Sequence, residues 1–440
     1  MSELPSGWTV ARIGDLISAG GVFVDGDWIE SKDQDPEGDV RLIQLADIGD
    51  GAFRDRSRRS LTSSKASELR CTYLHAGDVL IARMPNPLGR ACIFPGVTQP
   101  AVTAVDVCIV RPAPGGADPR WLMWAINAPR FRSSISELQS GTTRKRISRK
   151  NLATIELPVP PLNEQRRIVA AIEEQFSRLD AAEQLLRRAT ARTPPLRGAV
   201  YSVGTSGEWP TESLGELLRE PLRNGHSAKA SRTGDVRTLT LTAVTRGEFT
   251  DENTKLTGAD PARIANLWLE PGDVLIERSN TPELVGTAAL YRGGDRWAIF
   301  PDLLIRVRVA EKLLPEFLAI VLKSRPIRRY FQTSAQGIAG SMPKIDQGTV
   351  ARVEVPVPPL EEQRRIVNEV EQQLSLIDAM HRAIEAAKRR SAALRRSILE
   401  RAFRGELVPQ DPADEPASAF LERIAAEGAM ALSSRRGNSA

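Results

Sequence analysis

One stretch of this chain occurs twice, and that repeat limits the possible folds more than any other feature. LPVPPLNEQRRIV spans 157–169 and VPVPPLEEQRRIV spans 355–367, with differences at only two positions. The copies lie a little under half the chain apart, far more than the roughly 20–50 residues of a solenoid repeat. The sequence therefore predicts two related halves joined in one polypeptide.

The repeat extends beyond these copies to three further pairs of segments. They are SGWTVARIGDLIS (6–18) with GEWPTESLGELLR (207–219), YLHAGDVLIAR (73–83) with WLEPGDVLIER (268–278), and DPRWLMWAIN (118–127) with LPEFLAIVLK (314–323). Each half has a divergent region, then the PVPPL segment, then a charged stretch with helical periodicity. Matching anchors with divergence between them indicate one scaffold that carries two different surfaces.

Each divergent region has the pattern of a small α+β domain. GDVLI is typical of a glycine turn followed by a short buried strand. More apolar runs of strand length occur at 40–45, 105–110, 236–241 and 301–309. Apolar residues at three- and four-residue steps then predict helices over 118–127 and 314–323. We expect mostly-β bodies with a helical end.

The charged stretches predict two long helices with apolar seams. Proline fixes the backbone of each PVPPL segment in an extended connector. Beyond it, apolar residues recur at three- and four-residue spacing, as in a coiled coil. The predicted interface residues are Val169, Ile172, Phe176, Leu179 and Leu186 in the first copy, and Val367, Val370, Leu374, Ile377 and Ile384 in the second. Glu183 and His381 interrupt the two seams, either to fix the register or as a solvated helix edge.

These helices are expected to pack together as an antiparallel coiled coil, because each seam needs an apolar partner. Counting from Leu360 to Phe403 gives the second helix a length on the order of 60 Å. Pro194-Pro195 predicts a kink or break that shortens the first helix, where the second copy has Ala392-Ala393. The whole pattern predicts a pseudo-two-fold internal repeat.

Composition indicates a globular protein without a membrane segment. The chain has 440 residues and a net charge of +5, which permits an anionic partner without requiring one. No apolar run reaches the length of a membrane-spanning helix, and the first residues do not resemble a secretory signal. The three cysteines and three histidines are dispersed. They predict reduced thiols, no zinc site and a cytoplasmic protein.

The paired P-x-P-P-L-x-E-Q-R-R-I-V segments, the repeated GDVLI-x-R and the tail ELVPQDPADEPASAFLERI (406–424) resemble the DNA-specificity subunit of type I restriction–modification systems. The resemblance covers nearly the whole chain. It implies a sequence-specific double-stranded DNA-binding subunit without catalytic residues or cofactor. Two methyltransferase subunits would dock on its helices. Two restriction subunits can join, giving an adenine-specific methyltransferase and ATP-dependent endonuclease.

The same resemblance implies a domain order. The expected parts are a first target-recognition domain (1–156), a central connector and spacer helix (157–205), a second target-recognition domain (206–354), a distal connector and spacer helix (355–405) and a C-terminal tail (406–440). Each domain would read half of a split site. Half-site readers on one protein must be separated in step with the DNA helical repeat of about 34–36 Å, and a stiff coiled coil can serve as that ruler. Unlike domains imply an asymmetric site.

Basic residues at the end of each divergent region are the candidate DNA contacts, because phosphates attract lysine and arginine. The resemblance places DNA-contacting loops in GTTRKRISRK (141–150) and in its counterpart GIAGSMPKI (337–345), with Arg146 and Lys344 as matched positions. The complete predicted DNA-binding set is Arg83, Arg144, Lys145, Arg146, Arg149, Lys150, Arg278, Ser341 and Lys344. Arg83 and Arg278 follow the GDVLI strands and would either contact DNA or pair with local carboxylates.

Three alternatives remain at this stage. A self-contained methyltransferase or nuclease lacks support, because no NPPY-like motif, metal-nuclease pattern or P-loop is present. A coiled-coil scaffold without DNA specificity would tolerate replacement of both divergent regions. A specificity subunit could also serve a modification-only complex that has no restriction subunit.

Overall fold

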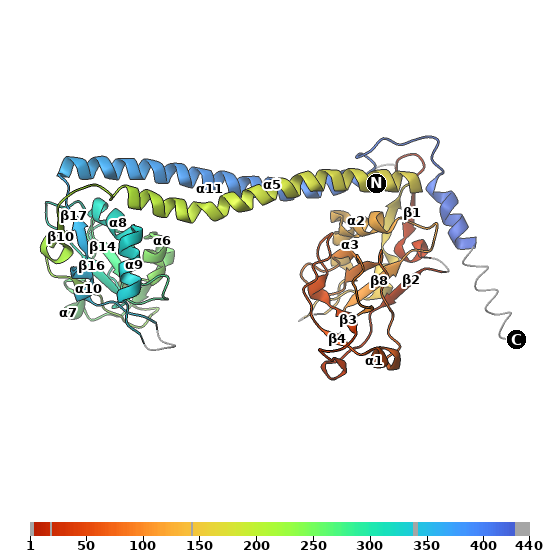
Figure 1. Cartoon of the computed structure of the whole chain (residues 1–440), viewed down its shortest axis with the longest axis horizontal. Helices are drawn as coiled ribbons and strands as arrows, with labels where there is room; N and C mark the ends of the chain where they lie inside the picture. The colour runs from red at the N-terminus through yellow and green to blue at the C-terminus, as the bar shows by residue number, and fades with distance from the viewer. Residues whose placement is uncertain (1–3, 18–19, 142–143, 338–341, 427–440) are drawn as a thin grey trace. The chain divides into compact units, whose positions relative to one another are not determined.

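The computed structural model describes residues 4–17, 20–141, 144–337 and 342–426 of the chain. It divides into two compact units, one formed by Met1–Leu185 with Ala387–Ala440 and the other by Leu186–Ala386. Each unit combines a globular body with parts of two long helices, α5 (Leu162–Val203) and α11 (Leu360–Ala402) (Figure 1).

The body of the first unit is built on a four-stranded antiparallel sheet in the order β2-β8-β5-β6. A three-stranded sheet, β4-β3-β7, and a two-stranded pair, β1-β9, complete it. The strands are β1 (Thr9–Arg12), β2 (Val22–Asp25), β3 (Val40–Ile43), β4 (Ser60–Leu61), β5 (Val79–Ala82), β6 (Ala91–Ile93), β7 (Ala101–Thr103), β8 (Val107–Arg111) and β9 (Glu156–Val159). The helices are α1 (Ser63–Glu68), α2 (Pro119–Asn127), α3 (Pro129–Leu138) and α4 (Arg149–Thr154).

The body of the second unit repeats this plan. Its four-stranded sheet has the order β11-β16-β14-β15, beside the pairs β12-β13 and β10-β17. The strands are β10 (Thr211–Ser213), β11 (Arg223–Asn224), β12 (Val236–Leu239), β13 (Thr254–Thr257), β14 (Val274–Glu277), β15 (Ala288–Leu290), β16 (Leu304–Val307) and β17 (Glu354–Pro356). The helices are α6 (Leu241–Arg246), α7 (Pro261–Ile264), α8 (Pro315–Lys323), α9 (Arg325–Ser334) and α10 (Gln347–Ala351).

The GDVLI segments form the central strands β5 and β14, whose residues are all buried. The paired helices α2-α3 and α8-α9 pack near these sheets, with Ile135 and Phe331 in the respective cores. Gly89 and Gly286, each at positive φ, sit against these two side chains, where a Cβ atom would come within 2.1 Å of Ile135 and 2.5 Å of Phe331. Glycine is therefore needed twice at the same place in the repeat.

The long helices pack antiparallel in each unit. In the first, Glu183 of α5 accepts a hydrogen bond from Ser391 of α11, and the earlier residue Asp180 pairs with the later residue Arg395. In the second unit, Val200 near the end of α5 shares a core with Ile366 near the start of α11. The prediction of two-body α+β architecture with packed antiparallel helices is confirmed.

The expectation that Pro194-Pro195 breaks and shortens the first helix was wrong. Helix α5 continues through both prolines for 42 residues, against 43 in α11. An interior proline costs about 3 kcal/mol because it removes an amide donor and crowds the preceding turn. Burial of Thr193 and Val200 on either side of the prolines offsets that cost, and Arg325 donates to the Pro195 carbonyl at 3.0 Å.

The C-terminal segment beyond α11 folds back on the first unit. Gln410 donates to the Glu164 carboxylate at 3.2 Å, and Asp414 pairs with Arg167 at 2.7 Å. Phe420 and Ile424 enter the same core as Trp8 and the start of α5. This tail closes a face of the first body.

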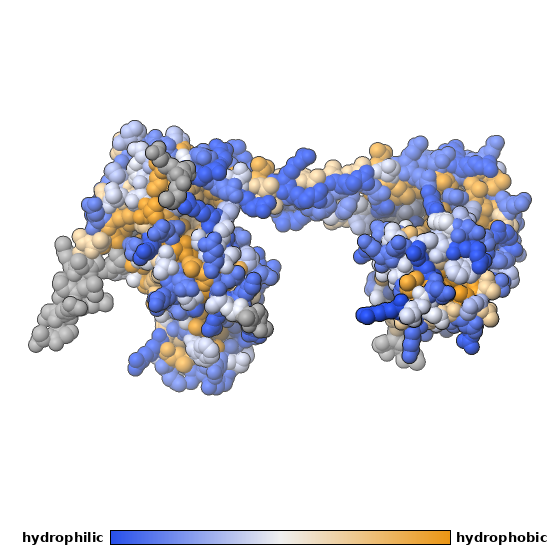
Figure 2. Space-filling model, turned by 180° about the vertical axis from the view of Figure 1, so that it is seen from behind, coloured by the Kyte–Doolittle hydropathy of each residue, from blue (hydrophilic) through white to orange (hydrophobic). Residues whose placement is uncertain are grey.

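Polar side chains cover much of each body on the face drawn in Figure 2, with apolar residues visible between them. Across the described parts of the chain, no helix is both long and apolar enough to cross a membrane. The same residues contain no cluster of three or more His, Cys, Asp or Glu side chains arranged to hold a metal ion.

Candidate nucleic-acid interface

A loop closed by paired backbone hydrogen bonds follows the second body helix in each unit. Ser140 and Arg146 exchange two backbone hydrogen bonds of 2.9 Å. Gln336 and Lys344 do the same at 2.9 and 2.8 Å. Arg146 and Lys344 therefore close their loops at equivalent positions, as the repeat predicted.

Each loop is joined to the end of a central strand. The backbone amide of Ile147 donates to the Arg83 carbonyl, and that of Ile345 donates to the Arg278 carbonyl. Strands β2 and β5 both run antiparallel to β8, so their carboxyl ends share one edge of the sheet. The loop, Arg83 and Asp25 meet at that edge.

Basic side chains of the first loop are exposed. Arg144, Lys145, Arg146 and Lys150 form no ion pair with any residue in the described ranges. Exposed cations without an ion-pair partner can contact phosphates. Their role in DNA binding stays a prediction.

Two other predicted arginines are engaged within the first body. Arg83 has a side chain only 14% exposed, with Nη1 2.7 Å from the Asp25 carboxylate and Nε donating to the Ile147 carbonyl. Arg149 lies 3.7 Å from the same carboxylate and also donates to the Phe23 carbonyl. This geometry favours the local-carboxylate interpretation of Arg83.

In the second unit, the corresponding edge of the sheet has the same layout but carries fewer charged side chains. Arg278 is half-buried and reaches the Asp302 carbonyl at 3.5 Å, while Lys344 is exposed. Gln347 donates to Asn224 at 3.2 Å, where the first unit has the ion pair of Arg149 with Asp25. Ser341 lies outside the described residues. The two edges thus present different chemistry from one scaffold.

The predicted helix seams are buried in separate units. Val169, Ile172 and Phe176 belong to the core of the first unit, and Val367, Val370 and Ile377 to that of the second. Leu179 and Leu374 pack at the margins of these cores, Leu186 is half-buried and Ile384 is buried. Glu183 binds Ser391 and Arg395 across the helix pair, whereas His381 is exposed.

Sequence reasoning missed the roles of the paired glutamines in the repeated EQRR segment. Gln165 and Gln363 are fully buried. Gln165 donates to the Pro160 carbonyl and accepts from the Asp118 amide at the start of α2. Gln363 makes the matching bonds to Pro358 and Leu314. The sequence signal for these roles was that glutamine occurs at the same position in both repeated segments.

A second missed feature is the aspartate of each GDVLI segment. Asp78 is buried and receives two hydrogen bonds from Arg111, at 2.6 and 2.7 Å. These bonds raise the pKa of the Arg111 guanidinium above its ordinary value. In the second unit, Asp273 holds Arg308 with bonds of 2.5 and 3.0 Å.

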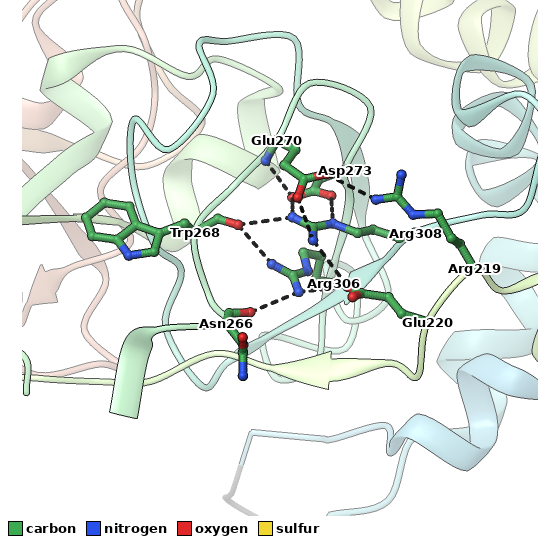
Figure 3. Close-up of polar contacts among 8 residues, drawn as sticks. All are labelled: Arg219, Glu220, Asn266, Trp268, Glu270, Asp273, Arg306 and Arg308. Carbon is green, nitrogen blue, oxygen red and sulfur yellow. Dashed lines mark hydrogen bonds and ion pairs between the residues drawn. The ribbon is translucent and has the colours of Figure 1, made fainter. Parts of the chain in front are cut away.

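The second unit extends this pair into the network drawn in Figure 3. Arg306 is 1% exposed, and its Nη2 donates to Glu220 at 2.8 Å. Both arginines also donate to the Trp268 carbonyl at 3.0 Å. Burial lowers the pKa of Arg306 below its ordinary value. The donors of Arg306 and Arg308 are used within the body, where they join the loop before β14 to β16. This network lies at the end of β14 opposite to Arg278.

Comparison with models of protein families identifies the family that has this architecture. The model of the type I restriction modification DNA specificity domain matches residues 5–189 and 243–389. The chain belongs to this family. The resemblance predicted from the repeated segments is confirmed, and the chain is a DNA-specificity subunit by descent and fold.

Curated members of the specificity family align with most of the chain. The EcoKI specificity subunit of Escherichia coli strain K12 is 29% identical over 326 residues, covering 68% of this chain and 69% of that protein. The StySPI specificity subunit of Salmonella potsdam is 27% identical over 340 residues, covering 71% and 72%.

Solved structures of specificity subunits share the fold. A chain from a structure on complex assembly and conformational transition of a type I system has a TM-score of 0.74 at 20% identity, covering 92% of this chain and all of that one. The HsdS subunit of Thermoanaerobacter tengcongensis has a TM-score of 0.57 at 20% identity, with 92% and 98% covered.

Proposed function

We propose that this specificity subunit directs a type I restriction–modification complex to a bipartite, asymmetric duplex site. Residues 1–156 read one half-site and residues 206–354 read the other. The central (157–205) and distal (355–405) segments provide the spacer helices, and residues 406–440 form the tail. The subunit itself is non-catalytic and needs no cofactor.

The observation that carries this proposal is the pair of equivalent loops at 140–146 and 336–344. They close at the same place in the repeat yet differ in charge and sequence. Related scaffolds with unlike reading surfaces are expected when two different half-sites must be recognised. Arg144, Lys145, Arg146 and Lys344 are proposed to approach the DNA, with phosphate contacts setting position and base contacts setting sequence.

The repeat also supports the proposed stoichiometry. Two repeat-related helix ends in one chain offer related surfaces to two copies of the same protein. We propose that two methyltransferase subunits dock there and methylate adenine in the cytoplasm. Two restriction subunits can add the ATP-dependent endonuclease.

The proposal is tested by mapping methylated adenines in the DNA of cells that carry this chain with its methyltransferase partner. We expect a single asymmetric motif of two specified parts separated by unspecified base pairs. A palindromic or uninterrupted motif would overturn the bipartite proposal. The purified chain alone should methylate and cut nothing.

A further inference from the structure

A lysine without a counter-ion lies beneath the long helices of the second unit. Lys323 ends α8, and its ammonium lies 5.7 Å from the centre of the Tyr201 ring of α5. Among the described residues, it has no hydrogen-bond or ion-pair partner. Burial, with positive Arg197 and Arg292 nearby, lowers the pKa of the ammonium below its ordinary value.

The two neighbouring arginines are already paired. Arg197 pairs with Asp378 and Arg292 pairs with Glu371. Their carboxylates are therefore committed to other cations. Lys323 is half-buried, and a partly desolvated ammonium is stabilised when an anion reaches it, so Lys323 can bind a negatively charged ligand.

The side chain lies at a cavity of about 200 Å³ within the second unit. The cavity is bounded by α8, by the first half of α11 and by Tyr201 near the end of α5. Its apolar lining includes Ile320, Val370 and Leu374. A volume of several water molecules accommodates the end of an aspartate or glutamate side chain.

We propose that this cavity binds a carboxylate side chain of a methyltransferase subunit docked on the second unit. The inference rests on the proposed function, in which such subunits dock on the helices. A DNA phosphate is disfavoured because the half-buried Lys323 lies in a recess of the second unit. A protein side chain can enter a recess that a rigid duplex cannot.

The first unit lacks this feature at the equivalent place. Asn127 occupies the repeat position of Lys323, and it exchanges hydrogen bonds of 3.0 and 2.9 Å with the backbone of Ala91. The corresponding groove is larger, about 850 Å³, and is lined by Trp124 and Phe176. Two copies of one partner would therefore be held by different contacts, with the carboxylate bound only in the second unit.

Chemical footprinting of the intact complex tests the inference without a variant. Lysines of the free chain and of its co-purified methyltransferase complex are acetylated briefly with an N-hydroxysuccinimide ester and quantified by mass spectrometry. We expect at least tenfold slower acetylation of Lys323 in the complex. The exposed Lys229 of the same unit should be unchanged. Equal Lys323 rates in the two samples would overturn the inference.

Carbodiimide coupling identifies the carboxylate. The reagent activates a carboxylate, and the Lys323 amine then displaces the activated group to form an amide, releasing the reagent as a urea. We expect a crosslink from Lys323 to an aspartate or glutamate of the methyltransferase subunit. A crosslink only to a second copy of this chain, or to its own residues, would overturn the proposal.

The matched variants are Lys323→Met, Lys323→Arg and the control Lys229→Met. Lys323→Met should weaken binding of one methyltransferase copy at least tenfold, while Lys323→Arg and Lys229→Met retain two copies by native mass spectrometry. If a folded Lys323→Met chain bound both methyltransferase copies as tightly as the wild type, the carboxylate proposal would fail and the proposed function would stand. If the wild-type chain formed no such complex, the proposed function itself would fail.

Discussion

Asp78 shows how one buried residue can join separate parts of a body. Its carboxylate is 1% exposed, accepts the His75 backbone amide at 2.8 Å and binds Arg111 through two hydrogen bonds. Asp273 repeats both interactions with Glu270 and Arg308. The same aspartate thus shapes the turn before each central strand and joins that strand to its neighbour.

Substitution of Asp78 by alanine should strongly destabilise the first unit. The change leaves the Arg111 charge without its carboxylate, and breaking a buried pair in this way costs about 3 kcal/mol. Urea unfolding followed by hydrogen exchange should place the loss in the first unit. Glu37→Ala, at an exposed carboxylate, is the control. Equal unfolding free energies for the two variants would show that the pair has little structural value.

The exposed cations of the first loop should govern the salt dependence of DNA binding. Replacing Arg144 and Lys145 with alanine removes up to two phosphate contacts, and each lost contact reduces the slope of log K against log salt by about 0.9. Binding of the assembled complex to its duplex should therefore weaken and become less salt-dependent. Arg178→Ala, on the exposed face of α5, should leave the slope unchanged. An unchanged slope in the double variant would remove these residues from the interface.

Sequence reasoning located strands and basic loops at the residue scale but not the partners of individual side chains. It identified the GDVLI strands because turn and strand preferences are local. It could not pair Asp78 with Arg111, since their contact depends on which strands become neighbours in the sheet. For the same reason, the sequence allowed a carboxylate partner for Arg83 but could not name Asp25, which the fold brings to both Arg83 and Arg149.

At the scale of elements, the long helices are stabilised by the bodies as well as by each other. Phe176 of α5 packs edge-to-face on Trp124 of α2 with ring centres 5.0 Å apart, and the Arg395 guanidinium of α11 lies 4.8 Å from its ring. One seam residue therefore joins three helices. The three- and four-residue spacing of apolar side chains predicted the helices well because that signal is local.

Phe176→Ala should test this three-way contact. Truncation of a buried phenylalanine costs about 3–5 kcal/mol through lost burial and the cavity left behind. Leu185→Ala, on the same helix but 64% exposed, should change the unfolding free energy little. Thermal and urea unfolding of the two variants provide the measurement. A small loss of unfolding free energy in Phe176→Ala would mean that other contacts stabilise α5.

The mistaken prediction at Pro194-Pro195 shows the limit of local rules for elements. Proline disfavours a helix interior wherever nothing else stabilises the helix. Here the turns beyond the prolines bury Val200 against α11, and Ser202 accepts a hydrogen bond from the Arg325 amide. Tertiary packing therefore decides the outcome, and a single sequence does not reveal it.

At the scale of the whole molecule, the paired helices are proposed to set the distance between the two half-site readers. Inserting about seven residues after Ala181, with a matching insertion in the facing part of α11, adds roughly 10 Å of helix. The unspecified gap in the methylated motif should lengthen by about three base pairs, or recognition should be lost. Adenine methylation mapping gives the gap directly. An active complex with the original gap would contradict the spacer role.

Each body is proposed to read its own half of the site. Residues 1–156 can be replaced by the corresponding segment of another specificity-family member, and methylated adenines mapped in cells carrying the hybrid with the methyltransferase. We expect one half of the motif to change while the other half and the gap persist. A motif that is unchanged, or that changes in both halves, would contradict it.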